Sequence, residues 1–318
     1  MAINMIQFQK GLSLEAFGKR YGTREQCEEI LEKAKWSGGF KCPRCKHDGA
    51  YIFRKGGRKI YQCGSCGCQT TLIADTIFEQ TKLSLPKWFL AIYFITQSKN
   101  SVSSMHLMRL LGVSYHTAWR IRHKLQHVMR IREERQKLSG VIELDDAYLG
   151  GENPGGKPGR GSENKVPFVA ALSRDENGHP FRVVFSRIEA FRKEVIRNWA
   201  EEVLDKKAVV ITDGLSCFLG IKDAGIQHEP NTVGYERKST EMECFLWINT
   251  ILGNLKRSLS GTFHSFRFRK YAHRYLAEYQ YRFNRRSRLS DLPIRCFYAC
   301  AQTKPNPEKT LRLADSWC

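Results

Sequence analysis

Apolar and polar positions follow different periods along the first half of the chain. In residues 13–36 the apolar positions have helical spacing, with a capping-type start at Thr23. Residues 37–80 are rich in Cys, Gly and β-forming residues, which predicts short hairpins. Residues 85–138 return to helical spacing, interrupted near Asn100 and Gly112. We therefore expect helices, a small hairpin region and a second group of helices.

The second half carries strand patterns followed by helical patterns. The expected strands are 140–150, 166–174, 180–188 and 208–214, and the expected helices are 192–205, 241–259 and 269–286. Three strands, a helix, a fourth strand and closing helices predict a mixed α/β domain. The chain then divides into a helical segment 1–36, a cysteine-rich segment 37–80, a helical region 81–138, an α/β domain 139–290 and a tail 291–318.

The composition favours a folded protein with a polyanionic partner. Hydrophobic residues make up 42% of the 318 positions, and this length predicts two or three domains. Lys and Arg number 52 against 32 acids, a net charge of +20, which favours nucleic acid first and an anionic membrane second. Because there is no run of about 18 apolar residues and no secretory h-region, we expect a cytoplasmic protein without membrane contact.

Five of the eleven cysteines lie within 27 residues. Two C-x-x-C pairs, Cys42/Cys45 and Cys63/Cys66, are separated by 17 residues that include a Gly-Gly turn. Two such knuckles can supply the four thiolates that Zn²⁺ prefers, so we expect one structural zinc ion on these four cysteines. Cys68 is an alternative ligand to Cys66. A redox C-x-x-C would need a thioredoxin-like context, which this segment lacks.

Residues 101–125 have the pattern of a helix-turn-helix. Gly112 permits a tight turn, and Ser114 is a candidate N-cap for the second helix. The alternative is an ordinary helical hairpin with a solvated basic face. On the first interpretation, the residues expected to contact DNA are His116, Arg120, Arg122 and Lys124.

Two expected strands end in carboxylates. Asp145 and Asp146 end the first strand, and Asp213 ends the strand 208–214. Functional groups collect at the carboxyl ends of strands in open sheets, and such like-charged side chains are costly unless a cation lies between them. Mg²⁺ takes oxygen ligands of this kind. The alternative is that each Asp belongs to a plain turn.

No acidic residue follows Glu243 in the helical pattern 241–259. Asn249 instead lies seven positions before Lys256, and two helical turns bring both side chains to nearly the same face. The Asn249 amide oxygen could ligate Mg²⁺, and Lys256 could hold a DNA phosphate. Glu241 and Glu243 are lower-ranked substitutes for Asn249.

The ordered stretches "CPRC…CGSC", "VIELDDAYLGG", "VVITDG", "WINTILGNLKRSLSGTFH" and "YLAEYQYRFNRR" resemble bacterial insertion-sequence transposases with a zinc ribbon before a DDE-type, ribonuclease-H-like catalytic domain. The resemblance implies catalytic roles for Asp145, Asp213, Asn249 and Lys256, and magnesium ligation by the first three. Many members carry Glu where this chain has Asn249, so an Asp-Asp-Asn variant is expected.

The resemblance also implies a reaction and its partners. Two Mg²⁺ ions would support hydrolysis at the transposon end and attack of the freed 3′-OH on target DNA. Double-stranded DNA, a homo-oligomer on paired ends and a location at the nucleoid are expected. The rival interpretations are a catalytically inactive DNA-binding regulator and a zinc-ribbon nuclease that cuts without joining.

Between residues 251 and 290, ten Lys or Arg accompany one Glu, with aromatic residues interleaved. The aromatic residues can belong to a core while the basic face follows a DNA backbone. The alternative is a basic face that is only solvated. The residues expected to contact DNA here are Lys256, Arg257, Arg282, Arg285 and Arg286.

Overall fold

A computed structural model describes residues 6, 8–134, 136–150, 165–231, 242–263 and 267–314. The basic, glycine-rich stretch "PGGKPGRG" at 154–161, whose composition predicts a loop, lies outside this part of the chain. Contacts divide the chain into two compact units. Unit 1 comprises Met1–Val128 and Ser287–Cys318, and unit 2 comprises Met129–Arg286.

Unit 2 is built on a five-stranded sheet with the order β6-β5-β4-β7-β8. Strands β4, β5 and β6 are antiparallel, whereas β7 and β8 run parallel to β4, so the predicted mixed α/β, ribonuclease-H-like class is confirmed. The bounds are β4 Val141–Leu149, β5 Val166–Arg174, β6 Pro180–Arg187, β7 Val209–Thr212 and β8 Gln227–Pro230. The sequence had indicated four strands, because the short, polar β8 carries no strand pattern.

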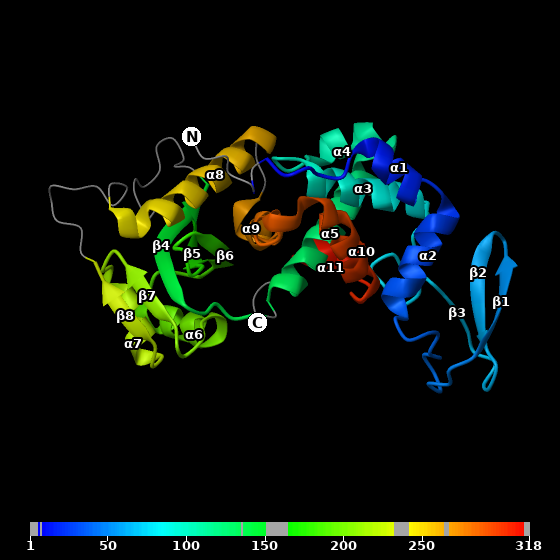
Figure 1. Ribbon diagram of the computed structural model, residues 1–318, viewed down its shortest axis with the longest axis horizontal. Helices are drawn as coiled ribbons and strands as arrows, with labels where there is room; N and C mark the ends of the chain where they lie inside the picture. The colour runs from blue at the N-terminus through cyan, green and yellow to red at the C-terminus, as the bar shows by residue number, and fades with distance from the viewer. Residues whose placement is uncertain are drawn as a thin grey trace. The chain divides into compact units, whose positions relative to one another are not determined.

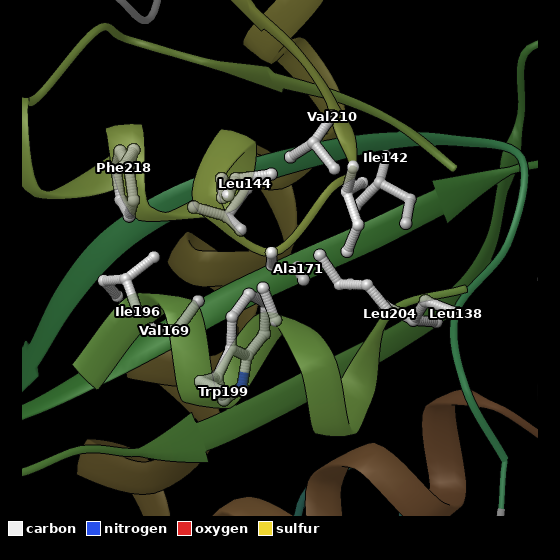
Figure 2. Packing of buried hydrophobic residues seen from close by; sticks show 14 of the residues in the cluster. Leu138, Ile142, Leu144, Val169, Ala171, Ile196, Trp199, Leu204, Val210 and Phe218 are labelled. Carbon is white, nitrogen blue, oxygen red and sulfur yellow. The ribbon is translucent and has the colours of Figure 1, made fainter. Parts of the chain in front are cut away.

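Helices cover both faces of this sheet. Strand β4 alternates, so that Ile142 and Leu144 enter one core with Trp199 of α6 (Figure 2) while Ala147 and Leu149 enter a second core with α8 and α9. The elements on the first face are α6 Lys193–Val203, η2 Ser216–Leu219 and α7 Gly220–Asp223; those on the second are η4 Glu243–Phe245, α8 Leu246–Thr262 and α9 Phe268–Phe283.

Unit 1 combines a small antiparallel sheet with helices (Figure 1). Thr23 and Gln26 form the predicted capping box, and Gly56 and Gly57 form the hairpin turn at positive φ. Its strands are β1 Ala50–Lys55, β2 Arg58–Cys63 and β3 Gln69–Thr71. Its helices are α1 Leu14–Tyr21, α2 Arg24–Lys35, α3 Leu85–Gln97, α4 Ser104–Leu111, α5 Tyr115–Glu133 (whose last residues belong to unit 2), η5 Arg286–Asp291, α10 Leu292–Ala301 and α11 Glu308–Leu313.

The C-terminal residues complete the helical part of unit 1. Phe297 of α10 stacks on Phe89 of α3 at 3.9 Å between ring centroids and also meets the ring of Tyr21. The segment therefore supplies core side chains to helices that precede it by more than two hundred positions. In the part of the chain that the structure describes, no helix is long and apolar enough to cross a membrane.

Candidate metal centres and DNA-contacting residues

The carboxylates of strands β4 and β7 converge at one edge of the unit 2 sheet. The two strands are parallel neighbours with Glu143 opposite Ile211, so Asp145, within β4, and Asp213, directly after the end of β7, each come two residues later. Asp145, Asp146 and Asp213 each offer an oxygen, and these three atoms lie within 4.8 Å of one another. The predicted convergence of these carboxylates is therefore present, but Asp145 and Asp146 lie within β4, which continues to Leu149, and only Asp213 follows a strand end.

This grouping raises the pKa of Asp145. Burial, together with the charges of Asp146 and Asp213, raises its pKa to about 7, against the lowering effects of the Asp146 backbone N–H and of the Lys256 charge. Three carboxylates at this separation repel one another unless protons or a cation offset their charge. Their oxygen donors and their crowding fit a hard divalent cation such as Mg²⁺.

Strand alternation distinguishes the two adjacent aspartates. Asp145 lies two residues before Ala147, which enters the core beneath α8, so Asp145 points to the α8 face. Asp146 follows Leu144, which enters the opposite core with α6. Asp145 therefore shares its face with the helix that carries Asn249, whereas Asp146 approaches the cluster from the other side.

Hydrogen bonds hold the loop after β7. The Leu215 N–H donates to Asp213 Oδ1 at 3.1 Å, and the Gly214 N–H donates to Thr212 Oγ1 at 3.2 Å. The buried Thr212 hydroxyl also pairs with His228 Nε2 on β8 at 2.8 Å. One oxygen of Asp213 is thus tied to its own turn, which orients the carboxylate.

Helix α8 places Asn249 and Lys256 on one flank. Asn249 is half-buried, and its Nδ2 donates to the Phe245 carbonyl at 2.9 Å, so its Oδ1 is the acceptor that remains for a ligand. Lys256 is exposed, two turns further along. Ligation by Asn249 stays a prediction. Of the lower-ranked substitutes, Glu241 and the side chain of Glu243 lie outside the described residues.

A buried ion pair that the sequence analysis did not identify joins β4 to the start of α8. Glu143 is fully buried, and its carboxylate accepts hydrogen bonds from the Ile248 N–H at 2.8 Å and from Arg174 Nε at 2.5 Å. Arg174 also donates to the Cys244 carbonyl at 2.9 Å. Ile248 precedes Asn249, and Glu143 lies two residues before Asp145. A charged residue between Ile142 and Leu144 was the signal that could have revealed this pair.

Four cysteines of unit 1 form a second cluster. The sulfurs of Cys42, Cys45, Cys63 and Cys66 lie within 4.8 Å of one another, with Cys42···Cys66 at 3.6 Å and Cys45···Cys63 at 3.5 Å. Cys68 is not in this group; its carbonyl accepts the Cys63 N–H at 2.9 Å. The structure therefore selects Cys66 over Cys68.

Backbone donors lower the pKa of two of these thiols. N–H groups of Cys45 and Arg44 lower the pKa of Cys42, to about 6, and those of Cys66 and Ser65 lower the pKa of Cys63. Four sulfurs within 4.8 Å of one another, two of them with a lowered pKa, fit Zn²⁺. The donor set leaves no ligand position for substrate, as expected of a structural ion.

The helix pair α4–α5 has the local geometry expected of a helix-turn-helix. Gly112 lies at φ +59°, and Ser114 Oγ accepts the Thr117 N–H at 3.3 Å as an N-cap. His116 and Arg120 are exposed on α5, and Arg120 has a long contact of 3.5 Å to Glu308. These two residues stay candidates for DNA contact.

Two other expected DNA contacts of unit 1 require correction. Arg122 is 1% exposed and donates to Ser101 Oγ at 3.3 Å. Lys124 is half-buried and donates from Nζ to the Ile77 carbonyl at 2.8 Å. Every residue from 121 to 130 of α5 is buried or half-buried, so both side chains are enclosed, although the sequence analysis had placed them on the solvent face. We therefore remove Arg122 and Lys124 from the candidate DNA contacts.

The basic residues of unit 2 also divide into those open to solvent and those held by contacts within the fold. Lys256 and Arg257 are exposed on α8, and Arg282 is half-buried. Arg285 instead pairs with the buried Glu133 and lies 3.8 Å above the Tyr281 ring. Arg286 donates to backbone carbonyls, among them that of Phe283 at 3.0 Å. Arg285 and Arg286 therefore hold the end of α9 in place, and their expected DNA contacts are withdrawn.

Comparison with known proteins gives two matches to protein families and one curated relative. Residues 137–284 match the ISXO2-like transposase domain, and residues 22–69 match the transposase zinc-ribbon domain. Together these matches cover more than half of the chain. An "Uncharacterized protein in transposable element ISH50" from Halobacterium salinarum is 28% identical over 135 residues, which is 41% of this chain and 44% of that relative. The match therefore spans less than half of the relative's length.

Proposed function

Because this chain belongs to the insertion-sequence transposases with a zinc ribbon before an ISXO2-like transposase domain, we propose that it cuts DNA at insertion-sequence ends and joins the freed 3′ end to target DNA, in a reaction that requires Mg²⁺. The observation that carries this proposal is the grouping of Asp145, Asp146 and Asp213 within 4.8 Å, on parallel strands and beside α8. Carboxylates this close together are costly unless a cation lies between them, which favours a metal-dependent reaction over DNA binding alone.

Asp145 and Asp213 would hold magnesium, with Asn249 as the third protein ligand. Bound magnesium would polarise the scissile phosphodiester and lower the pKa of an attacking water or 3′-hydroxyl. Each Asp supplies a full negative charge, whereas Asn249 supplies only an amide dipole, so the site binds its cations through the aspartates. The number of ions, two by analogy with related chemistry, stays a prediction.

The chain's other residues would position the DNA. Lys256, on the same flank of α8 as Asn249, would contact a phosphate close to the carboxylates, and Arg257 would follow the backbone beside it. In unit 1, His116 and Arg120 would contact duplex DNA from α5. The pair Glu143–Arg174 would hold the start of α8 against β4, which sets the position of Asn249 relative to Asp145.

The test is a cleavage and strand-joining assay on DNA that flanks the native gene, with wild type, Asp213→Ala and Asn249→Ala. We expect Mg²⁺-dependent joined products from wild type, none from Asp213→Ala and a strong loss in Asn249→Ala. Glu229→Ala, an exposed substitution on the neighbouring strand β8, serves as the matched control. Activity that survives Asn249→Ala would contradict the ligand assignment.

The same assay separates the two rival functions. Cut DNA without joined product would indicate a nuclease. Tight binding with neither product, in Mg²⁺ or Mn²⁺, would indicate a regulator derived from a transposase. Assembly of a homo-oligomer on paired ends belongs to the proposal as well, and sedimentation of the chain with end DNA checks it.

A further inference from the structure

The small sheet of unit 1 has two faces with different chemistry. On the inner face, the buried Tyr61 packs between Trp36 and Phe40. The basic residues of this face are neutralised by α2: Arg54 pairs with Glu28 at 2.7 Å and Lys59 with Glu32 at 2.5 Å. The basic residues of this face are therefore already paired with acidic residues of α2.

The outer face presents aromatic rings and an uncompensated cation. Antiparallel register places Tyr51, Phe53 and Lys55 of β1 on one face, with Ile60 and Gln62 of β2 beside them. Tyr51 is 73% exposed and Phe53 38% exposed. Within the described residues, Lys55 has no ion-pair partner within 4.0 Å, whereas the inner-face basic residues Arg54 and Lys59 do. The strand β1 lies at the edge of its sheet (Figure 1).

We propose that this outer face binds single-stranded DNA, with unpaired bases stacked on Tyr51 and Phe53 and a phosphate held by Lys55. Two aromatic residues at positions i and i+2 of one strand lie about 7 Å apart on the same face, so each ring can take its own base. Exposed rings beside a cation are the combination that binds unpaired nucleic acid without reading its sequence. The inference rests on the proposed function, because opened insertion-sequence ends would supply the unpaired bases.

A second copy of the chain is the other occupant that an edge strand can take. Pairing of β1 with a second β1 would use the backbone groups of the edge, but it would leave the rings of Tyr51 and Phe53 exposed on the same face. It would also bring together two chains that each carry a net charge of +20. Single-stranded DNA offers bases that can stack on the exposed rings and phosphates that can pair with the positive charge, so the observations favour DNA.

The experiment measures binding of the full-length, zinc-loaded chain to a fluorescent single strand and to the matching duplex, by anisotropy over a salt series. All variants carry Asp213→Ala so that the DNA is not cut. Tyr51→Thr and Phe53→Thr remove a ring but keep a β-forming residue. Ile52→Thr is the matched control, because Ile52 lies on the opposite face of the same strand and is 54% exposed.

We expect Tyr51→Thr and Phe53→Thr each to weaken single-strand binding about fivefold or more, with a duplex affinity changed by less than about twofold and an unchanged zinc content. Lys55→Ala should reduce the salt dependence for the single strand by about 0.7 in the log–log slope. Ile52→Thr should change neither.

Three results would overturn the inference. Equal losses in Ile52→Thr would mean that the strand, not its outer face, matters. Parallel losses on single strand and duplex would mean a general phosphate contact. A change in sedimentation with unaltered single-strand binding would point to pairing of β1 between copies. Because no DNA is cut in this experiment, its outcome is independent of whether the carboxylate cluster is catalytic.

Discussion

The molecule contains two clusters of potential metal ligands, and they are assembled in opposite ways. The four cysteines come from two knuckles within 25 residues, and their sulfurs lie within 4.8 Å of one another. Asp145 and Asp213 come from strands far apart in sequence that meet only because β4 and β7 are neighbours. A closed set of soft ligands stabilises a fold, whereas an open set of crowded carboxylates holds an ion that substrate can reach.

The largest effect is expected from removal of the four-cysteine zinc site. Cys63→Ser should abolish zinc binding and unfold the small sheet, because the ion supplies an apparent free energy on the order of 10–16 kcal/mol in such sites. Hydrogen exchange of β1 to β3, with zinc analysis, measures the effect. Cys68→Ser is the control and should retain zinc. Equal zinc loss in both variants would contradict the choice of Cys66.

A smaller but still large effect is expected at the buried pair beside the carboxylates. Glu143→Ala leaves Arg174 without its partner, and we expect a loss of about 3–5 kcal/mol in the free energy of unfolding. Glu143→Gln, which keeps the shape and an acceptor for the Ile248 N–H, should lose less. Hydrogen exchange at the start of α8 is the local readout. Unchanged exchange there in Glu143→Ala would show that the pair does not hold α8.

Substitution of Asp145 should instead raise the free energy of unfolding, because the carboxylate cluster destabilises the folded chain when no cation is added. Its pKa is about 7 in the folded chain, against an ordinary value near 3.9 when unfolded. The folded state keeps the proton to higher pH, so stability is fully present below about pH 4 and is lost as the pH rises through 7. Asp145→Asn should therefore add about 2–4 kcal/mol at pH 8.

The pH dependence of that gain is the check. In zinc-loaded protein without added Mg²⁺, urea unfolding should show the stabilisation by Asp145→Asn at pH 8 and almost none at pH 4. Added Mg²⁺ should reduce the difference at pH 8, because the cation stabilises only the wild-type cluster. A gain of the same size at both pH values would mean that repulsion between the carboxylates is not its cause.

The smallest expected effect concerns α5, where an exposed arginine, Arg120, is compared with a buried one, Arg122. Arg120→Ala should weaken duplex binding a few-fold and lower the salt slope by about 0.9, with stability almost unchanged. Arg122→Ala should instead lower stability, because Arg122 is buried against Ser101. Titration of both variants with duplex DNA at several salt concentrations measures this. Identical behaviour of the two variants would contradict the assignment of their faces.

The sequence predicts features that depend on short spacing. The C-x-x-C knuckles, the Thr23 capping box and the Gly112 turn all involve residues close in the chain, and each is present. The strand formers before Asp145 and Asp213 were also visible in the sequence, although β4 continues past Asp145 to Leu149. Local chemistry and strand patterns were enough to locate both clusters.

Features that depend on long-range packing were not predicted. Arg122 and Arg285 are basic residues of the kind that contact DNA. In the structure, however, Arg122 donates to Ser101 and Arg285 pairs with Glu133, and neither partner is a neighbour in sequence. The fifth strand, β8, is short and polar, and only its place beside β7 makes it a strand. The stacking of Phe297 on Phe89 likewise required the tertiary fold.

The central claim is that the carboxylate cluster of unit 2 binds a divalent cation, and the most direct test is a titration of the zinc-loaded chain with Mn²⁺ followed by electron paramagnetic resonance. Wild type should bind Mn²⁺ in competition with Mg²⁺, and Asp145→Asn and Asp213→Asn should each lose that binding while their zinc content stays the same. Mn²⁺ binding that is unaffected by either substitution would contradict the account.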